Sequence, residues 1–255
     1  MNLVFLRHLV HIDKEKAQAL TDQDVIDRWC TLHNKPVLIQ QLLTVDTKSD
    51  AEINACKTII DEWRSRLANL SWFMRELNLD IATQANKEDK CTGHFWEGRF
   101  KCQALLDEQA LAAAMVYVDL NPIRAGIAKT PEKSDYTSIK ARLQALKDEK
   151  LTAPSLCPFI GNPTNSIIKG IPMRLMDYIE LVDWTGRQLR ENKTGYIEST
   201  IPPILHRLSI EQQDWIKACT QLERQRALLI GSSQSIQIAT VNFNRSRVQG
   251  YRLTT

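Results

Sequence analysis

Tyr117 is the residue whose type and surroundings are best suited to covalent chemistry. It is expected on a helix, on the face that also carries small side chains, Ala110, Ala113 and Ala114. Asn121 follows one turn later, so a phenol and an amide oxygen could face the same substrate. A phenol has a pKa of about 10 and becomes a nucleophile only beside a stabilising cation. The alternative is a half-buried aromatic residue with a solvated hydroxyl group.

The helix that carries Tyr117 is indicated by the period of its apolar residues, which recur at helical spacing as Leu111, Met115 and Val118. Asp107 places a capping group and negative charge where a helix begins. Pro122 disfavours helical geometry at Asn121, and Gly126 is a natural stop. The helix is therefore expected to end close to Tyr117.

An aromatic and basic patch precedes this helix in the segment FWEGRFK. Basic side chains bind phosphates and aromatic rings stack on unpaired bases, a combination that suits single-stranded nucleic acid. Trp96, Arg99 and Lys101 are the candidate DNA contacts. The alternative is structural, with Phe95 and Phe100 filling a core beside a strand of alternating residues, and the two interpretations are compatible.

Two motifs together carry a resemblance to a known family. FWEGRFK is followed by YVDLNPIRAG, then by a proline and the tripeptide YTS. This arrangement resembles the REP-associated tyrosine transposases, which belong to the single-tyrosine (HUH-type) transposases. The likeness continues through DKEKAQALTDQDVIDRW and YIELVDWTGRQLRENKTG, so it covers most of the chain.

The resemblance implies a function. Tyr117 would be the catalytic nucleophile, becoming joined to the 5′ end of single-stranded DNA near hairpins during DNA transposition. Asn121 would be a ligand of Mg²⁺ or Mn²⁺, and Arg124, within the second motif, would contact DNA. The partner is thus single-stranded or hairpin DNA, and a homodimer is left open. The fold expected is α+β and mostly helical, a partial ferredoxin-like domain followed by a helical C-terminal module.

The sequence departs from the family at the metal site. The family holds its metal with a His-hydrophobe-His pair, and Phe5 and Arg7 stand at those positions. His8 and His11 are three residues apart, so on a strand they point to opposite faces. The first sheet-forming half of the domain also has no counterpart before Phe5. These departures predict a truncated or degenerate copy, and two alternatives to catalysis: an inactive module that binds hairpin DNA, or a fragment without activity.

Composition is compatible with a cytoplasmic protein. The 255 residues carry a net charge of +3, which permits nucleic acid as a partner without requiring it. The six cysteines include no C-x-x-C pair, and the apolar run at the N-terminus is too short for a signal or a membrane helix. Free thiols in a reducing cytoplasm and no membrane association are expected.

The domain prediction places the transposase-like remnant at residues 1–150, a linker rich in proline and glycine at 151–170, and the helical module at 171–255. The first range is expected to hold an edge strand at 3–12, a capped helix from Thr21, and one long amphipathic helix over 57–86. The last range is expected to hold a helix over 210–229 and a basic tail. In residues 222–255 five arginines face Glu223 alone, a balance of 5 − 1 = +4, which suits either phosphate binding or a solvated end.

Overall fold

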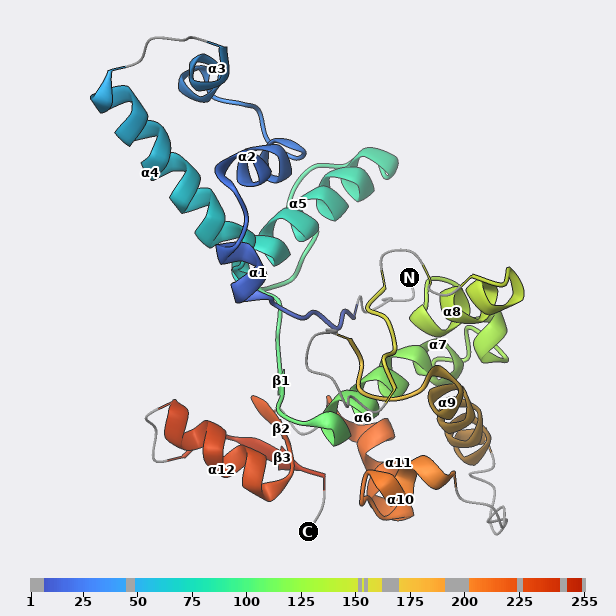
Figure 1. Ribbon diagram of the computed structural model, residues 1–255. Helices are drawn as coiled ribbons and strands as arrows, with labels where there is room; N and C mark the ends of the chain where they lie inside the picture. The colour runs from blue at the N-terminus through green and yellow to red at the C-terminus, as the bar shows by residue number, and fades with distance from the viewer. Residues whose placement is uncertain are drawn as a thin grey trace. The chain divides into compact units, whose positions relative to one another are not determined.

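The computed structural model describes residues 7–44, 49–150, 153, 156–161, 170–190, 202–223, 227–243 and 247–253. The chain forms two compact units. Unit 1 comprises Met1–Leu9 and Cys102–Thr255, and unit 2 comprises Val10–Lys101. Helices dominate both units, and a small parallel sheet accompanies them in unit 1, which confirms the α+β, mostly helical prediction (Figure 1).

Unit 2 is built from helices. They are α1 (Lys14–Gln18), α2 (Asp22–Cys30), α3 (Val37–Thr44), α4 (Asp50–Leu67) and α5 (Leu70–Glu88). The predicted cap at Thr21 is confirmed, because its side chain accepts from the Asp24 N–H while the Asp24 carboxylate accepts from the Thr21 N–H. The same reciprocal cap, from Ser49 and Glu52, begins α4.

The single long helix predicted over 57–86 is wrong, because the chain leaves the helix between α4 and α5. Ala68, at the end of α4, has φ −102° and ψ 18°. Asn69 then caps α5 by accepting hydrogen bonds from Ser71 N and Trp72 N at 2.9 and 3.3 Å. A single capping asparagine therefore divides a continuous apolar pattern into two helices.

The core of unit 2 is centred on tryptophans. Trp29 stacks on Trp63 with ring centroids 5.7 Å apart and an interplanar angle of 13°, and Trp72 meets Trp29 edge-on at 6.0 Å. Val25 and Ile26 are buried in the same cluster. The sequence-based interpretation of Trp29 as a packing residue is therefore confirmed.

Unit 1 contains a larger set of elements. Its helices are α6 (Glu108–Asp119), α7 (Asn121–Arg124), the 3₁₀ turn η1 (Pro131–Lys133), α8 (Ser138–Lys147), α9 (Leu175–Arg190), α10 (Pro203–Arg207), α11 (Gln212–Gln221) and α12 (Ser233–Asn242). Its strands are β1 (Ala104–Leu105), β2 (Leu229–Gly231) and β3 (Gly250–Arg252), paired in parallel in the order β1-β2-β3. Ala104 is in register with Leu229, and Leu229 with Gly250.

Helix α6 lies at the centre of unit 1. It contacts α9 and α11, as Figure 1 shows, and its alanines are buried in the core that Tyr178 and Trp215 share. One hydrophobic core thus joins residues on both sides of the segment predicted as a linker. Most of that segment, residues 151–152, 154–155 and 162–169, lies outside the described residues.

Two local expectations in unit 1 are corrected. Asn121 is helical, because α7 begins there directly after Leu120 ends α6 with φ −87° and ψ −1°. Pro122 stands in the first turn of α7, where proline needs no hydrogen-bond partner. The helix predicted over 210–229 is also shorter, because α11 ends at Gln221 and Leu229 begins β2.

Parts of both chain ends that the sequence-based predictions cover lie outside the described residues. Residues 7–12 form no strand, and 1–6 lie outside the described residues, as do Arg224, Arg226 and Arg245 of the predicted basic tail. Within the part of the chain that is described, no helix combines the length and the apolar character needed to cross a membrane.

Candidate functional site

Tyr117 is held near the end of α6 by the way this helix begins and packs. Asp107 caps the helix by accepting a hydrogen bond from Ala110 N at 2.9 Å. Ala110, Ala113 and Ala114 are buried, and small side chains let α11 lie close to α6. Tyr117 itself is 6% exposed. Tyr117 is therefore more deeply buried than the half-buried aromatic residue of the alternative interpretation.

Two guanidinium groups lie against the ring of Tyr117. The Cζ atom of Arg124 is 3.9 Å from the ring centroid, and that of Arg7 is 5.6 Å away. A cation over an aromatic face is attracted by the ring's negative quadrupole. Arg124 is fixed further by donating from Nη1 to the carbonyl oxygen of Cys219 at 2.8 Å.

Glu223, just after α11, supplies a carboxylate that pairs with Arg7. Arg7 donates from Nη2 to Oε2 of Glu223 at 2.8 Å and from Nε to Oε1. Tyr117 also interacts with this ion pair, since its phenol contributes to raising the pKa of Arg7 and to lowering that of Glu223. Among the described residues, two guanidinium groups and one carboxylate therefore lie around the phenol, with a net charge of 2 − 1 = +1. We call Arg7, Tyr117, Arg124 and Glu223 the tyrosine cluster.

The electrostatics of the tyrosine cluster favour the charged forms of Arg7 and Glu223. Hydrogen bonds from Arg7 lower the pKa of Glu223, with the charge of Arg7, the Tyr117 hydrogen bond and the charge of Arg124 acting in the same direction and burial opposing them. Hydrogen bonding to Glu223 raises the pKa of Arg7, against the effect of burial. Glu223 is thus a carboxylate near neutral pH, able to accept a proton.

A divalent metal ion does not fit the donors around Tyr117. Mg²⁺ and Mn²⁺ prefer oxygen ligands in octahedral geometry, and a guanidinium group cannot ligate either ion. The Glu223 carboxylate is already paired with Arg7. Asn121, the predicted metal ligand, lies half-buried at the start of α7. Among the described residues no group of three or more histidine, cysteine, aspartate or glutamate side chains is placed to hold a metal ion.

The predicted site residues fall into both compact units. Tyr117, Asn121 and Arg124 belong to unit 1, and the structure brings Arg124 against Tyr117. Trp96, Arg99 and Lys101 belong to unit 2. The structure thus joins one of the predicted DNA contacts to the tyrosine.

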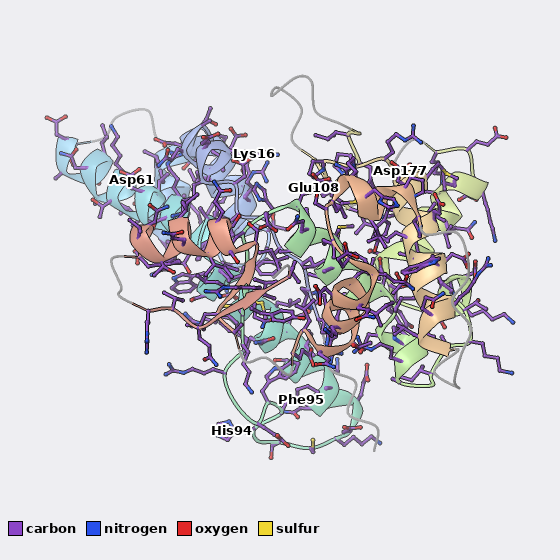
Figure 2. The ribbon with its side chains drawn as sticks, turned by 90° about the horizontal axis from the view of Figure 1, so that it is seen from below. Lys16, Asp61, His94, Phe95, Glu108 and Asp177 are labelled. Carbon is purple, nitrogen blue, oxygen red and sulfur yellow. The ribbon has the colours of Figure 1, made fainter. Side chains whose placement is uncertain are left out.

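The unit 2 patch is an open loop between α5 and the unit boundary. Trp96 donates from Nε1 to the Asn78 carbonyl oxygen at 2.9 Å and meets Phe95 edge-on at 4.9 Å. His94, Phe95, Trp96, Glu97, Gly98 and Arg99 line a shallow hollow of about 470 Å³. Figure 2 shows His94 and Phe95 on this loop, and Arg99 and Lys101 are exposed. The loop therefore presents an anchored indole beside exposed basic side chains.

Arg7 and Glu223 were not among the predicted site residues. A signal existed for Arg7, because it stands where the resemblance places the second metal-binding histidine. Glu223 is the one acidic residue among the arginines of residues 222–255, which hints at a paired role. Arg7 and Glu223 are 216 positions apart in the sequence, so local spacing does not predict their contact.

A second polar cluster lies two residues further along α6. Asp119 is fully buried and accepts from Ser138 Oγ at 2.9 Å, from Ile139 N at 3.1 Å and from the hydroxyl group of Tyr178. Burial raises the pKa of Asp119 although these hydrogen bonds oppose it, and burial also raises the pKa of Tyr178 well above its ordinary value. We call Asp119, Ser138 and Tyr178 the aspartate cluster.

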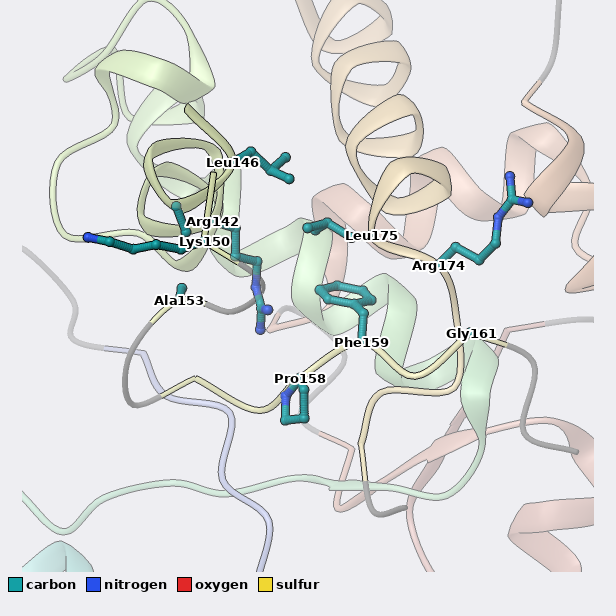
Figure 3. A pocket seen from close by; sticks show the side chains of 10 residues that line it. Arg142, Leu146, Lys150, Ala153, Pro158, Phe159, Gly161, Arg174 and Leu175 are labelled. Carbon is teal, nitrogen blue, oxygen red and sulfur yellow. The ribbon is translucent and has the colours of Figure 1, made fainter. Parts of the chain in front are cut away.

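A pocket of about 280 Å³ lies beside α8 and the start of α9. Figure 3 shows Arg142 and Phe159 in its wall, with the Arg142 guanidinium carbon 4.5 Å from the Phe159 ring centroid. Lys150 and Arg174 also line it, and they pair with Asp148 at 3.4 Å and with Asp177 at 3.0 Å. The residues that line this pocket include none of the tyrosine cluster.

Comparisons of the chain with protein families, with curated proteins and with solved structures found no significant match.

Proposed function

We propose that this chain is a DNA-binding protein of the single-tyrosine transposase type, in which Tyr117 cleaves and rejoins single-stranded DNA. The motifs FWEGRFK and YVDLNPIRAG resemble this class, and the catalytic domain would be a partial ferredoxin-like domain. One observation carries the catalytic part of the proposal: the guanidinium groups of Arg124 and Arg7 lie against the Tyr117 ring, and Arg7 is paired with the Glu223 carboxylate. In this proposal the carboxylate would accept the phenol proton, and the guanidinium groups would stabilise the phosphoryl group.

The reaction needs a deprotonated phenol and a stabilised phosphoryl group. Glu223 is positioned to accept the phenol proton as the Tyr117 oxygen attacks phosphorus. The new Tyr117 O–P bond replaces the bond from phosphorus to the 3′ oxygen, so the products are a 5′-phosphotyrosine and a 3′-hydroxyl. Arg7 and Arg124 would face the negative charge on the phosphoryl oxygens.

DNA binding would extend beyond the tyrosine. Trp96 offers a ring for stacking on an unpaired base, and Arg99 and Lys101 offer exposed charges for phosphates. The preferred ligand in this proposal is single-stranded or hairpin DNA. A cytoplasmic location and a homodimer that shares its DNA follow from the same class and belong to the proposal.

A second candidate function is hairpin-DNA binding without catalysis. The burial of Tyr117 favours it, because a side chain that is 6% exposed meets a phosphodiester only if its charged neighbours move. In that case Trp96, Arg99 and Lys101 would hold DNA while the tyrosine cluster stabilises the fold.

Labelled DNA separates the two functions. The protein is incubated with 5′- and 3′-labelled hairpin oligonucleotides, and the products are resolved on a denaturing gel beside the Tyr117→Phe variant. Tyr136→Phe is the matched control, since Tyr136 is a fully exposed tyrosine in the same unit. Catalysis predicts a protein-linked 5′ end that Tyr117→Phe loses and Tyr136→Phe keeps. A retarded band in a binding gel without any covalent product supports the binding function instead.

A further inference from the structure

We infer that Arg7 and Arg124 act in place of a metal ion, so that phosphodiester cleavage by Tyr117 proceeds without a divalent cation. This inference rests on the proposed function and concerns how the same site works. It names two further catalytic side chains, together with Glu223 as the proton acceptor.

The first argument is the position of positive charge. Both guanidinium groups lie within 6 Å of one ring, at 3.9 and 5.6 Å from its centroid. Counted over the described residues, Glu223 neutralises one of them and an excess positive charge remains beside the phenol. A phosphodiester carries one negative charge and would balance it. A divalent cation would instead add two positive charges to a site that already has a surplus.

The second argument is the supply of hydrogen-bond donors. A guanidinium group has five N–H donors in a planar fork that matches phosphate oxygens. Among the described residues, Arg124 directs one hydrogen bond to the Cys219 carbonyl oxygen. Its other donors stay available to a ligand, and this anchor holds the fork against the Tyr117 ring. Arg124 is therefore oriented before a phosphate arrives.

The third argument concerns access. The Arg7 side chain is 16% exposed, while that of Glu223 is 50% exposed. A phosphate group can reach the cluster from the Glu223 side and compete for the Arg7 fork, because guanidinium groups bind carboxylate and phosphate in the same bidentate geometry. Ligand binding then frees the Glu223 carboxylate from Arg7 and leaves it beside the phenol that it deprotonates.

The proton balance closes within these residues. Glu223 takes the proton from the Tyr117 hydroxyl group as the oxygen–phosphorus bond forms. The same proton passes to the departing 3′ oxygen, so Glu223 returns to its carboxylate form. No electron transfer or additional reactant is needed, and rejoining is the reverse of these steps.

The test compares cleavage in a metal chelator with cleavage in Mn²⁺. Purified full-length protein is mixed with labelled hairpin DNA in excess EDTA or in Mn²⁺, and the covalent 5′ product is measured over time. We expect equal rates in the two buffers. Arg124→Lys is expected to lower the rate by roughly 10²-fold, the loss typical of one removed transition-state donor. Arg174→Ala is the control, since Arg174 lies on the separate pocket and pairs with Asp177.

Two readouts exclude a purely structural effect. Cooperative unfolding of each variant by denaturant shows that the fold is intact. Methylguanidinium added to Arg7→Ala or Arg124→Ala should restore part of the lost rate, because the free cation can occupy the vacated position.

The outcomes separate the inference from the function on which it rests. A covalent product that forms in Mn²⁺ and disappears in EDTA overturns the metal-independent chemistry and leaves Tyr117 as the nucleophile. No covalent product in either buffer overturns the proposed catalysis and this inference together. Full activity of both arginine variants in EDTA also overturns the inference, since the charges would then have no part in the reaction.

Discussion

Unit 1 contains two tyrosine–carboxylate pairs, and their surroundings differ. Tyr117 lies beside the Arg7–Glu223 ion pair and a second guanidinium group, whereas Tyr178 donates to Asp119 inside a fully buried core. Asp119 stands two residues after Tyr117 on the same helix, α6. One helix therefore supplies a phenol to the first pair and a carboxylate to the second.

Charge and solvent decide what each pair can do. Burial raises the pKa of both Asp119 and Tyr178, so this phenol is a poor source of phenolate. Hydrogen bonds from Arg7 lower the pKa of Glu223, so this group is an ionised carboxylate near neutral pH. The comparison indicates that the aspartate cluster builds the core and that the tyrosine cluster is the one suited to chemistry.

The largest expected effect comes from removing each phenolic hydroxyl group in turn. Tyr117→Phe should abolish the covalent DNA product, because no oxygen is left to attack phosphorus. Tyr178→Phe should keep it, because the buried Tyr178 is no substitute nucleophile. Denaturing gels with labelled hairpin DNA measure both variants. If Tyr178→Phe loses the product while its fold is intact, the roles assigned to the two pairs are wrong.

Replacing the two carboxylates by amides should affect activity unequally. Glu223→Gln removes the proton acceptor and should lower the rate of covalent product formation by about 10²–10⁴-fold, the usual contribution of general acid–base catalysis. Asp119→Asn should leave the rate per folded molecule within a few-fold of the parent protein. Single-turnover rates, corrected for the folded fraction, make this measurement. Equal losses in the two variants would remove the distinction between the clusters.

Stability should respond in the opposite order. Asp119→Ala leaves the Ser138 hydroxyl, the Ile139 N–H and the Tyr178 hydroxyl without their acceptor, and each unsatisfied buried group costs about 1–3 kcal/mol. We expect the free energy of unfolding to fall by about 3–5 kcal/mol. Glu223→Ala should cost about 1 kcal/mol or less, since its ion pair is half exposed. Urea unfolding compares the two, and a larger loss for Glu223→Ala would contradict the structural role of Asp119.

The smallest expected effect is a difference in pH dependence. The pKa of Glu223 is lowered in the folded state, so its contribution to stability is present above its ordinary pKa of about 4.3 and disappears as the pH falls through the folded value. The pKa of Asp119 is raised, so its contribution is present below about 3.9 and disappears as the pH rises through the folded value.

Unfolding free energies between pH 3 and 7 test these opposite signs. The advantage of the parent protein over Glu223→Gln should shrink as the pH falls toward 3. The difference in unfolding free energy between the parent protein and Asp119→Asn should change in the opposite direction as the pH falls toward 3. Parallel pH profiles for the two variants would show that the carboxylates occupy similar environments.

The sequence by itself determined the local features of the fold. Asp107 and the period of the apolar residues located α6, the pair Thr21 and Asp24 located the start of α2, and Trp29 was identified as a core residue. Capping and periodicity act over three or four residues, so spacing along the chain carries this information. The same reasoning singled out Tyr117 and, through the family motif, Arg124.

Only the tertiary structure decided what surrounds Tyr117. Arg7 and Glu223 are 216 residues apart in sequence, and only folding brings them to one phenol. The break between α4 and α5 likewise depends on Asn69, which caps α5, and the continuous apolar pattern of the sequence does not indicate it. Long-range contacts form because distant segments bury one common core, and no local spacing encodes which charged residues meet at its edge. Tyr117 was therefore singled out from the sequence, whereas the neighbours proposed here as its cations and its proton acceptor required the fold.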